Sequence, residues 1–67
     1  MDKFNDKLKQ LRLERELPQN QVAEKLGITR AAYANYEQGI REPSYEILKR
    51  ICLFFEVSAD YLLGLED

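Results

Sequence analysis

The chain has no histidine and no tryptophan, and its single cysteine is Cys52. One cysteine cannot form an intrachain disulfide or a thiolate metal cluster. Without histidine, the commonest general base and the commonest neutral metal ligand are both missing. The three glycines are scattered along the chain, so no glycine-rich phosphate loop is present either. We therefore expect no enzymatic activity, no metal and no cofactor.

Long apolar runs are also missing. No segment approaches the roughly 18 consecutive apolar residues that a membrane span needs. The first seventeen residues mix charged and apolar side chains, unlike the apolar centre of a signal peptide. Since 45% of the residues are hydrophobic, the chain has enough apolar side chains to fold. These observations predict one soluble, cytoplasmic domain over residues 1–67, with no membrane partner.

A surplus of positive charge is missing as well. The net charge is −2 and the isoelectric point is near 5.1. Domains that bind nucleic acid are usually basic, because neutralising phosphates supplies much of their affinity. The overall charge therefore disfavours a nucleic-acid partner unless the positive side chains gather on one face.

Helix punctuation divides the chain into five short segments, and no strand-like alternation is present. We expect helices at about 3–15, 19–26, 30–38, 45–55 and 59–63, separated by proline, glycine and capping residues. Their predicted N-caps are Asp2, Thr29, Ser44 and Ser58, whereas Pro18 before the second helix provides no side-chain cap. The sequence thus predicts an all-α, compact five-helix bundle.

Apolar side chains at helical spacing predict which faces are buried. The predicted core stripes are Phe4, Leu8 and Leu11 in the first helix, Val22, Ala23 and Leu26 in the second, and Tyr45, Leu48, Ile51, Cys52 and Phe55 in the fourth. Cys52 is interpreted as a small buried apolar residue. We expect Leu13 to be exposed, and Lys3, Lys7 and Lys9 to form a solvated face together with neighbouring acids.

Residues 19–38 form two short helices joined by a turn that contains Gly27, which is the helix-turn-helix arrangement. On the third helix, Tyr33, Tyr36 and Glu37 share an inner face, and Ala31, Ala34, Asn35 and Gln38 lie opposite, flanked by Arg30 and Ala32. Arginine can bind guanine and asparagine can bind adenine, while alanine can contact a thymine methyl group. An outer face rich in alanine is also what a good helix former would show without any binding role.

Three stretches in order carry a resemblance to a known family. They are QVAEKLGITRAAYANYEQG at Gln21–Gly39, REPS at Arg41–Ser44 and VSADYLLG at Val57–Gly64. With them the chain resembles the lambda-repressor/Cro-like helix-turn-helix regulators of bacteria and phages from Phe4 to Leu65. The resemblance implies a five-helix bundle whose third helix reads the major groove of double-stranded DNA, in a chain that could be the N-terminal part of a longer regulator.

The resemblance also implies roles for individual residues. Arg30, Ala31, Ala32 and Asn35 would face base edges, whereas Gln19, Gln38 and Arg41 would contact the DNA backbone. Arg12 and Glu37 would form a buried or half-buried ion pair that sets the angle of the third helix. Several positions depart from the family pattern: Glu16 replaces a glycine, Ile40 replaces a basic residue, and Tyr33 replaces an aliphatic core residue. We expect the Tyr33 ring to pack while its hydroxyl stays near solvent or phosphate.

Two functions remain open at this point. The first is sequence-specific binding to a palindromic operator by a homodimer, most readily in repression. The second is a protein-interaction module, antitoxin-like or regulator-binding, with weak or no DNA binding. The acidic isoelectric point, Ile40 and the extra apolar residues Leu53 and Phe54 favour the second. Phe54 is expected either on a partner surface or beneath the fifth helix.

Overall fold

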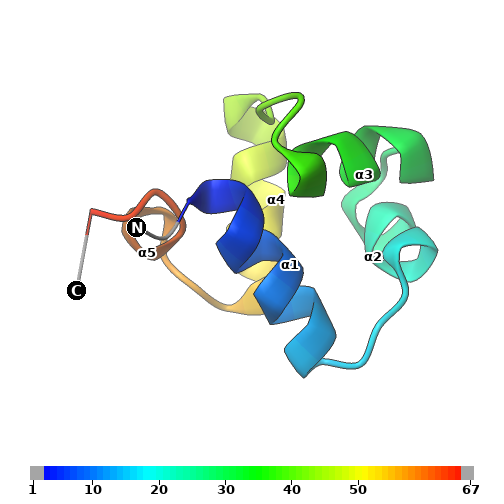
Figure 1. Cartoon of the computed structure of the whole chain (residues 1–67), viewed down its shortest axis with the longest axis horizontal. Helices are drawn as coiled ribbons and strands as arrows, with labels where there is room; N and C mark the ends of the chain where they lie inside the picture. The colour runs from blue at the N-terminus through cyan, green and yellow to red at the C-terminus, as the bar shows by residue number, and fades with distance from the viewer. Residues whose placement is uncertain (1–2, 66–67) are drawn as a thin grey trace.

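The computed structural model describes residues 3–65, which form five helices and no strand. The helices are α1 (Phe4–Glu14), α2 (Gln19–Leu26), α3 (Arg30–Gln38), α4 (Tyr45–Phe55) and α5 (Ala59–Leu62), as Figure 1 shows. The all-α, five-helix prediction is confirmed, and each helix end lies within a residue of its expected position. The proposed cap Asp2 lies outside the described residues.

Local side-chain chemistry explains where most of these helices begin. The hydroxyl oxygens of Thr29, Ser44 and Ser58 accept hydrogen bonds from backbone N–H groups three residues later, at 3.1, 3.2 and 3.0 Å. Each bond satisfies one of the N–H groups that a helix N-terminus leaves without a partner. As predicted, α2 begins after Pro18 with no side-chain cap.

The ends of α2 and α3 need backbone in the left-handed region. Gly27 and Gly39 take this conformation with φ of 75° and 77°. Two non-glycine residues also adopt it, since Glu16 has φ of 55° and Glu56 has φ of 57°. A side chain in this region costs roughly 1–2 kcal/mol. Glu16 therefore makes the turn that follows α1 at the position where the family pattern has glycine.

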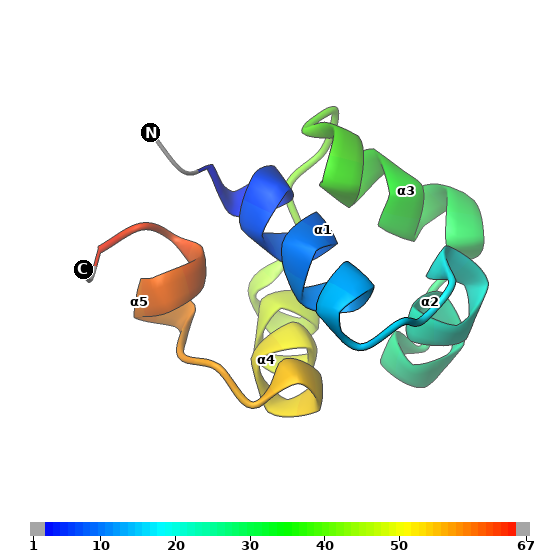
Figure 2. The same ribbon diagram turned by 60° about the horizontal axis from the view of Figure 1, so that its bottom comes forward.

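One apolar core joins all five helices. Its buried members are Leu8, Val22, Ala23, Leu26, Tyr33, Ile51, Phe55 and Leu62. Helix α3 packs on α1 and α2, α4 packs on α2, and α5 contacts both α1 and α4. Figure 2 shows α1 in the centre of the view with α3 and α5 on opposite sides of it. The fold thus places α3 at one edge of the bundle and α5 at the other.

Basic side chains tie helix C-termini to the rest of the bundle. Arg15 donates to the carbonyl oxygens of Phe54 and Phe55 at 3.4 and 2.9 Å, and Arg50 donates to that of Leu26 at 3.0 Å. Carbonyl groups in the last turn of a helix have no partner within the helix and carry partial negative charge, so these contacts are favourable. Arg15 and Arg50 therefore stabilise the fold through these contacts.

The prediction for Lys7 was wrong. Lys7 is buried instead of lying on a solvated face, and its Nζ donates to the Tyr61 carbonyl oxygen at 2.8 Å. The same nitrogen lies 4.7 Å from the centre of the Tyr61 ring, within the range of a cation–π contact. The physical reason is α5, which covers this side of α1 and supplies a carbonyl and an aromatic face for the ammonium group.

The prediction for Tyr45 was also wrong. Its side chain is 87% exposed, although its spacing from Leu48 places it on the apolar stripe of α4. Tyr45 is the first residue of α4, and its ring extends beyond the end of the buried stripe. Cys52, in contrast, is half-buried and packs against the core, and this burial raises the pKa of its thiol. Leu13 is exposed as expected.

Candidate nucleic-acid interface

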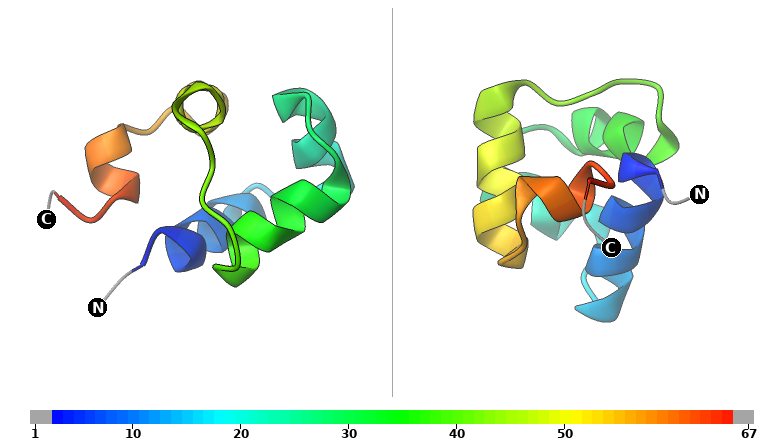
Figure 3. Two further views of the ribbon diagram at one scale, coloured as in Figure 1. Left: turned by 90° about the horizontal axis from the view of Figure 1, so that it is seen from above. Right: turned by 90° about the vertical axis from the view of Figure 1, so that its left-hand side faces the viewer.

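A tight turn sets the angle between α2 and α3. The Ile28 N–H donates to the Ala23 carbonyl oxygen at 3.0 Å, which closes the end of α2, and Thr29 then caps α3. Figure 3, viewed from above, shows α3 along one side of the molecule with α5 on the far side of α4. The predicted helix-turn-helix is therefore present, with its second helix at the surface.

The two faces of α3 differ as the sequence predicts. Tyr33 and Glu37 are buried and Tyr36 is half-buried on the inner face. Arg30, Ala31 and Gln38 are exposed, whereas Ala32, Ala34 and Asn35 are half-buried. In residues 3–65, no hydrogen bond or ion pair engages the side chains of Arg30, Asn35 or Gln38. These side chains are available for contacts outside the chain.

Arg41 is held close to the end of α3 by its backbone. The Ile40 and Arg41 N–H groups both donate to the Asn35 carbonyl oxygen, at 3.0 and 3.3 Å. The turn passes against α1, because a Cβ atom at Gly39 would lie 3.4 Å from the Asn5 side chain. Arg41 is exposed, and so is Ile40. The structure thus brings the Arg41 backbone against the end of α3 and places the Asn5 side chain next to Gly39.

The expected ion pair between Arg12 and Glu37 is present and buried. Arg12 Nε donates to Glu37 Oε2 at 2.6 Å and its Nη2 donates to Oε1 at 3.1 Å, with side-chain exposures of 11% and 3%. Arg12 Nη1 also donates to the Leu17 carbonyl oxygen at 2.9 Å. Such a bidentate pair fixes orientation as well as distance. It therefore fastens α3 to α1 and to the turn before α2.

This environment changes the ionisation of Glu37. Burial by itself would raise the pKa of the carboxyl group, but the hydrogen bonds from Arg12, the nearby Tyr33 hydroxyl, the Gln19 amide and the Arg12 charge together outweigh it, so the pKa is lowered. The hydrogen bond to Glu37 likewise raises the pKa of Arg12. Both partners are therefore charged at neutral pH.

Gln19 occupies the position for which the family resemblance implies a DNA phosphate contact. It is half-buried at the start of α2, and its Nε2 donates to Glu37 Oε1 at 3.2 Å. Sequence reasoning missed this internal contact, because no local pattern relates the start of α2 to the end of α3. Through this hydrogen bond, Gln19 belongs to the same group of contacting side chains as the Arg12–Glu37 ion pair.

The prediction for the Tyr33 hydroxyl was wrong. Tyr33 is 0% exposed, and its hydroxyl oxygen is buried with no hydrogen-bond partner in the described structure. Burial raises the pKa of this phenol well above its ordinary value, and the neighbouring Glu37 carboxylate adds to the effect. The hydroxyl cannot reach solvent because α3 packs directly onto α1 and α2 at this point.

Comparison with protein families adds an independent observation. The helix-turn-helix family model matches residues 8–62, which is most of the chain. The chain belongs to the lambda-repressor/Cro-like helix-turn-helix family.

Curated helix-turn-helix relatives include named transcriptional regulators. The uncharacterized HTH-type transcriptional regulator YqaE of Bacillus subtilis is 50% identical over 60 residues, covering 90% of this chain and 52% of the relative. The HTH-type transcriptional activator BcrR of Enterococcus faecalis is 45% identical over 64 residues, covering 96% of this chain and 31% of the relative. The chain therefore spans about half the length, or less, of these relatives.

Solved structures have the same helix-turn-helix fold. A transcriptional regulator from Listeria innocua superposes with a TM-score of 0.89 at 32% identity, over 97% of this chain and 61% of that one. The P22 c2 repressor, crystallised with a synthetic operator, gives a TM-score of 0.92 over 98% of this chain and 100% of that one. Because its sequence is only 21% identical, it shows likeness of fold alone.

Residues 3–65 offer neither a metal site nor a membrane-spanning helix. Residues 3–65 contain no group of three or more histidine, cysteine, aspartate or glutamate side chains that could hold a metal ion. Over the same residues, no helix is long and apolar enough to cross a membrane. The outer face of α3 remains the best-defined candidate site.

Proposed function

We propose that this chain binds double-stranded DNA sequence-specifically and regulates transcription, most readily as a repressor. The observation that carries the proposal is the outer face of α3, where Arg30 and Asn35 have no partner inside the bundle, while Glu37 fixes the inner face. An operator in the cell's own or a phage's DNA would place the protein in the cytoplasm.

The chemistry of this face suits the major groove. Arg30 can donate two hydrogen bonds to guanine O6 and N7, and Asn35 can bind adenine N6 and N7 in the same bidentate way. Ala31 and Ala32 are short enough to allow close approach and to contact thymine methyl groups. Gln38, Arg41 and Gln19 would hold the DNA backbone, which fixes register without reading sequence.

The names of relatives support regulation of transcription. YqaE is named a transcriptional regulator and BcrR an activator, whereas RstR of a cryptic phage in Vibrio cholerae, 35% identical over 54 residues, is named a repressor. A bound domain that covers a promoter blocks polymerase without needing any further contact. Repression by occupying a promoter is therefore the simplest activity for a DNA-binding fold of this kind.

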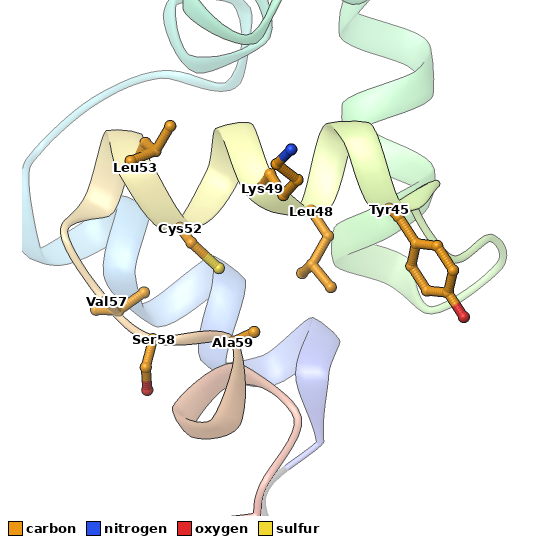
Figure 4. Close-up of a pocket in the computed structure, with 8 residues that line it drawn as sticks. All are labelled: Tyr45, Leu48, Lys49, Cys52, Leu53, Val57, Ser58 and Ala59. Atoms are coloured by element: carbon orange, nitrogen blue, oxygen red, sulfur yellow. The ribbon is translucent and has the colours of Figure 1, made fainter.

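A second copy of the chain is the proposed partner, on a face away from α3. A groove of about 380 Å³ between α4 and the start of α5 is lined mainly by apolar side chains, with Leu53 exposed at one end and Tyr45 at the other (Figure 4). The longest dimension of the domain is 30 Å, close to the roughly 34 Å that separates half-sites one helical turn apart. We infer that two copies meet through these grooves, so that both α3 helices can contact a palindromic operator.

Selection from randomised duplex DNA tests the main proposal. We expect one enriched, palindromic motif, and we expect the double variant Arg30→Ala, Asn35→Ala to lose it while remaining folded. Lys9→Ala, which removes an exposed cation from α1, is the matched control and should keep the motif. If the wild-type chain enriches no motif even when two copies are linked, the chain is a protein-interaction module instead.

Analytical ultracentrifugation tests the proposed homodimer separately from DNA recognition. Leu53→Glu places a charge on the α4 face far from α3, so it should abolish self-association and weaken binding to the full palindrome. The affinity for an isolated half-site should not change. A wild-type chain that stays monomeric both free and on the palindrome would contradict the homodimer.

A further inference from the structure

A continuous set of hydrogen bonds joins three helices at the edge of the proposed interface. It runs from Arg12 on α1 to Glu37 on α3 and from Glu37 to Gln19 on α2. Glu37 is the centre of the set, because its Oε1 accepts from both Arg12 Nη2 and Gln19 Nε2. One carboxylate therefore controls the position of a helix and of a separate side chain.

The bond to Glu37 restricts what Gln19 can do. A side-chain amide has two N–H donors and one carbonyl acceptor. One N–H of Gln19 is directed inward to Glu37, and no described contact uses the second N–H or the carbonyl oxygen. Since the two N–H bonds of an amide diverge, the second one points away from Glu37. Gln19 is half-buried, so this side of the amide can still meet a ligand.

We propose that Glu37, held in place by Arg12, orients the Gln19 amide so that its free N–H donates to a DNA phosphate. This inference rests on the proposed DNA-binding function and assigns Glu37 a positioning role in it, beyond setting the angle of α3. A glutamine held in one rotamer before binding loses less entropy when the phosphate arrives. The phosphate oxygen is an acceptor, which matches the donor that Gln19 has left.

Arg12 is needed for the electrostatics of this arrangement. A glutamate directly behind a phosphate contact would repel the DNA if its charge were not compensated. The bidentate bond from Arg12 compensates it at 2.6 and 3.1 Å, without directing the arginine itself to the DNA. The carboxylate can therefore act as an acceptor for Gln19 beside an anionic ligand.

The experiment is a phosphate scan on the duplex obtained by the selection described above. Each phosphate is replaced singly by an uncharged methylphosphonate, and the affinity of the wild-type chain is measured by fluorescence anisotropy. We expect one position in each half-site whose replacement weakens binding roughly tenfold and whose effect depends on Gln19, the order expected for one hydrogen bond to a charged group. In Gln19→Ala this penalty should disappear, whereas Gln21→Ala, an exposed glutamine on the same helix, should retain it.

The role of Glu37 is separated from folding by a double variant. Glu37→Met alone leaves Arg12 buried without a partner and risks unfolding, so Arg12→Met is combined with it, which removes both charges. If this variant gives a native-like circular dichroism melt, its Gln19 has no acceptor inside, and the penalty should fall to about threefold or less. A third variant that adds Gln19→Ala should lose whatever penalty remains.

Each result decides the question. A full tenfold penalty in Gln19→Ala would mean that Gln19 does not contact that phosphate, and the inference fails. A full penalty in the folded Arg12→Met, Glu37→Met variant would mean that Gln19 needs no positioning by Glu37, and the inference fails as well. In both cases the wild-type chain still binds its motif and the proposed function stands. If the wild-type chain selects no motif at all, the proposed function fails first.

Discussion

Arg12 and Glu37 can be replaced by methionine one at a time or together, and the three variants should differ sharply in stability. Each single replacement leaves one charge buried without its partner, since the two side chains are 11% and 3% exposed. Breaking a buried pair in this way costs roughly 3–5 kcal/mol. Replacing both partners by apolar side chains of similar length removes the desolvation cost as well, and is often nearly neutral.

The size of the domain makes these magnitudes decisive. A chain of 67 residues has a free energy of unfolding of about 3–10 kcal/mol, at roughly 0.05–0.15 kcal/mol per residue. Either single variant should therefore lose most of its stability, and the double variant should recover to within about 1–2 kcal/mol of the wild type. The measurement is urea denaturation at neutral pH, followed by far-ultraviolet circular dichroism.

A surface pair on α4 provides the matched control. Arg50 Nε lies 3.3 Å from Glu46 Oε2, with side-chain exposures of 47% and 65%, so Glu46→Ala should cost no more than about 0.5 kcal/mol. If Arg12→Met and Glu37→Met each cost less than about 1 kcal/mol and their effects add in the double variant, the two residues do not act as a buried pair. The account of how α3 is held would then be wrong.

Four further outcomes follow from individual groups. Tyr33→Phe should leave stability unchanged or raise it by up to about 1 kcal/mol in the same urea assay, because the hydroxyl is buried without a partner. Glu56→Gly should stabilise the domain by roughly 1 kcal/mol, since φ is 57° there, whereas Glu56→Ala should give no such gain. Folding lowers the pKa of Glu37, so the stability that its charged form confers is present above the ordinary pKa of 4.5 and is lost as the pH falls through the folded-state pKa. Urea midpoints measured stepwise from neutral to acidic pH should show this loss in the wild type and not in the double methionine variant. On the selected duplex, a plot of log affinity against log salt concentration should have a slope near −0.9 for each cation that neutralises a phosphate, and Arg41→Ala should make it shallower by about that amount per copy.

Helix positions could be predicted because they depend on neighbouring residues. Thr29, Ser44 and Ser58 each cap a helix through a backbone N–H three positions away. Gly27 and Gly39 end helices through their own backbone conformation. The apolar spacing within each helix then selects the buried face. All this information lies within a few residues of the element that it determines.

The wrong predictions concern contacts across the fold. Lys7 looks solvated among charged neighbours, but its partner Tyr61 lies 54 residues away on α5. Tyr45 fits the apolar spacing of α4, yet spacing does not show that the core ends before the first turn of the helix. For Tyr33, helical phase places the ring inside correctly, but only the packing of α1, α2 and α3 decides whether its hydroxyl reaches solvent.

In the candidate site, too, some features follow from neighbouring residues and others from packing between helices. The outward face of α3 follows from helical phase, and its proposed roles follow from the family resemblance. The bond between Gln19 and Glu37 could not be predicted, because residues 18 positions apart meet only after α2 and α3 pack together. The ion pair with Arg12 was expected from the resemblance alone, since no spacing rule relates a residue on α1 to one on α3.

The acidic net charge is compatible with a DNA-binding role when the basic side chains inside the bundle are distinguished from those on α3 and the turn after it. Lys7, Arg12 and Arg15 all donate to backbone carbonyl oxygens of other segments of the chain, so they stabilise the packing of the bundle. On α3 and the turn after it, Arg30 and Arg41 are the basic residues, and the other proposed polar contacts are neutral amides. Neutral donors gain little from counterion release, so the affinity of one copy must be small. We therefore expect binding under cellular salt to depend on two copies that share one operator, which is the arrangement proposed for the groove between α4 and α5.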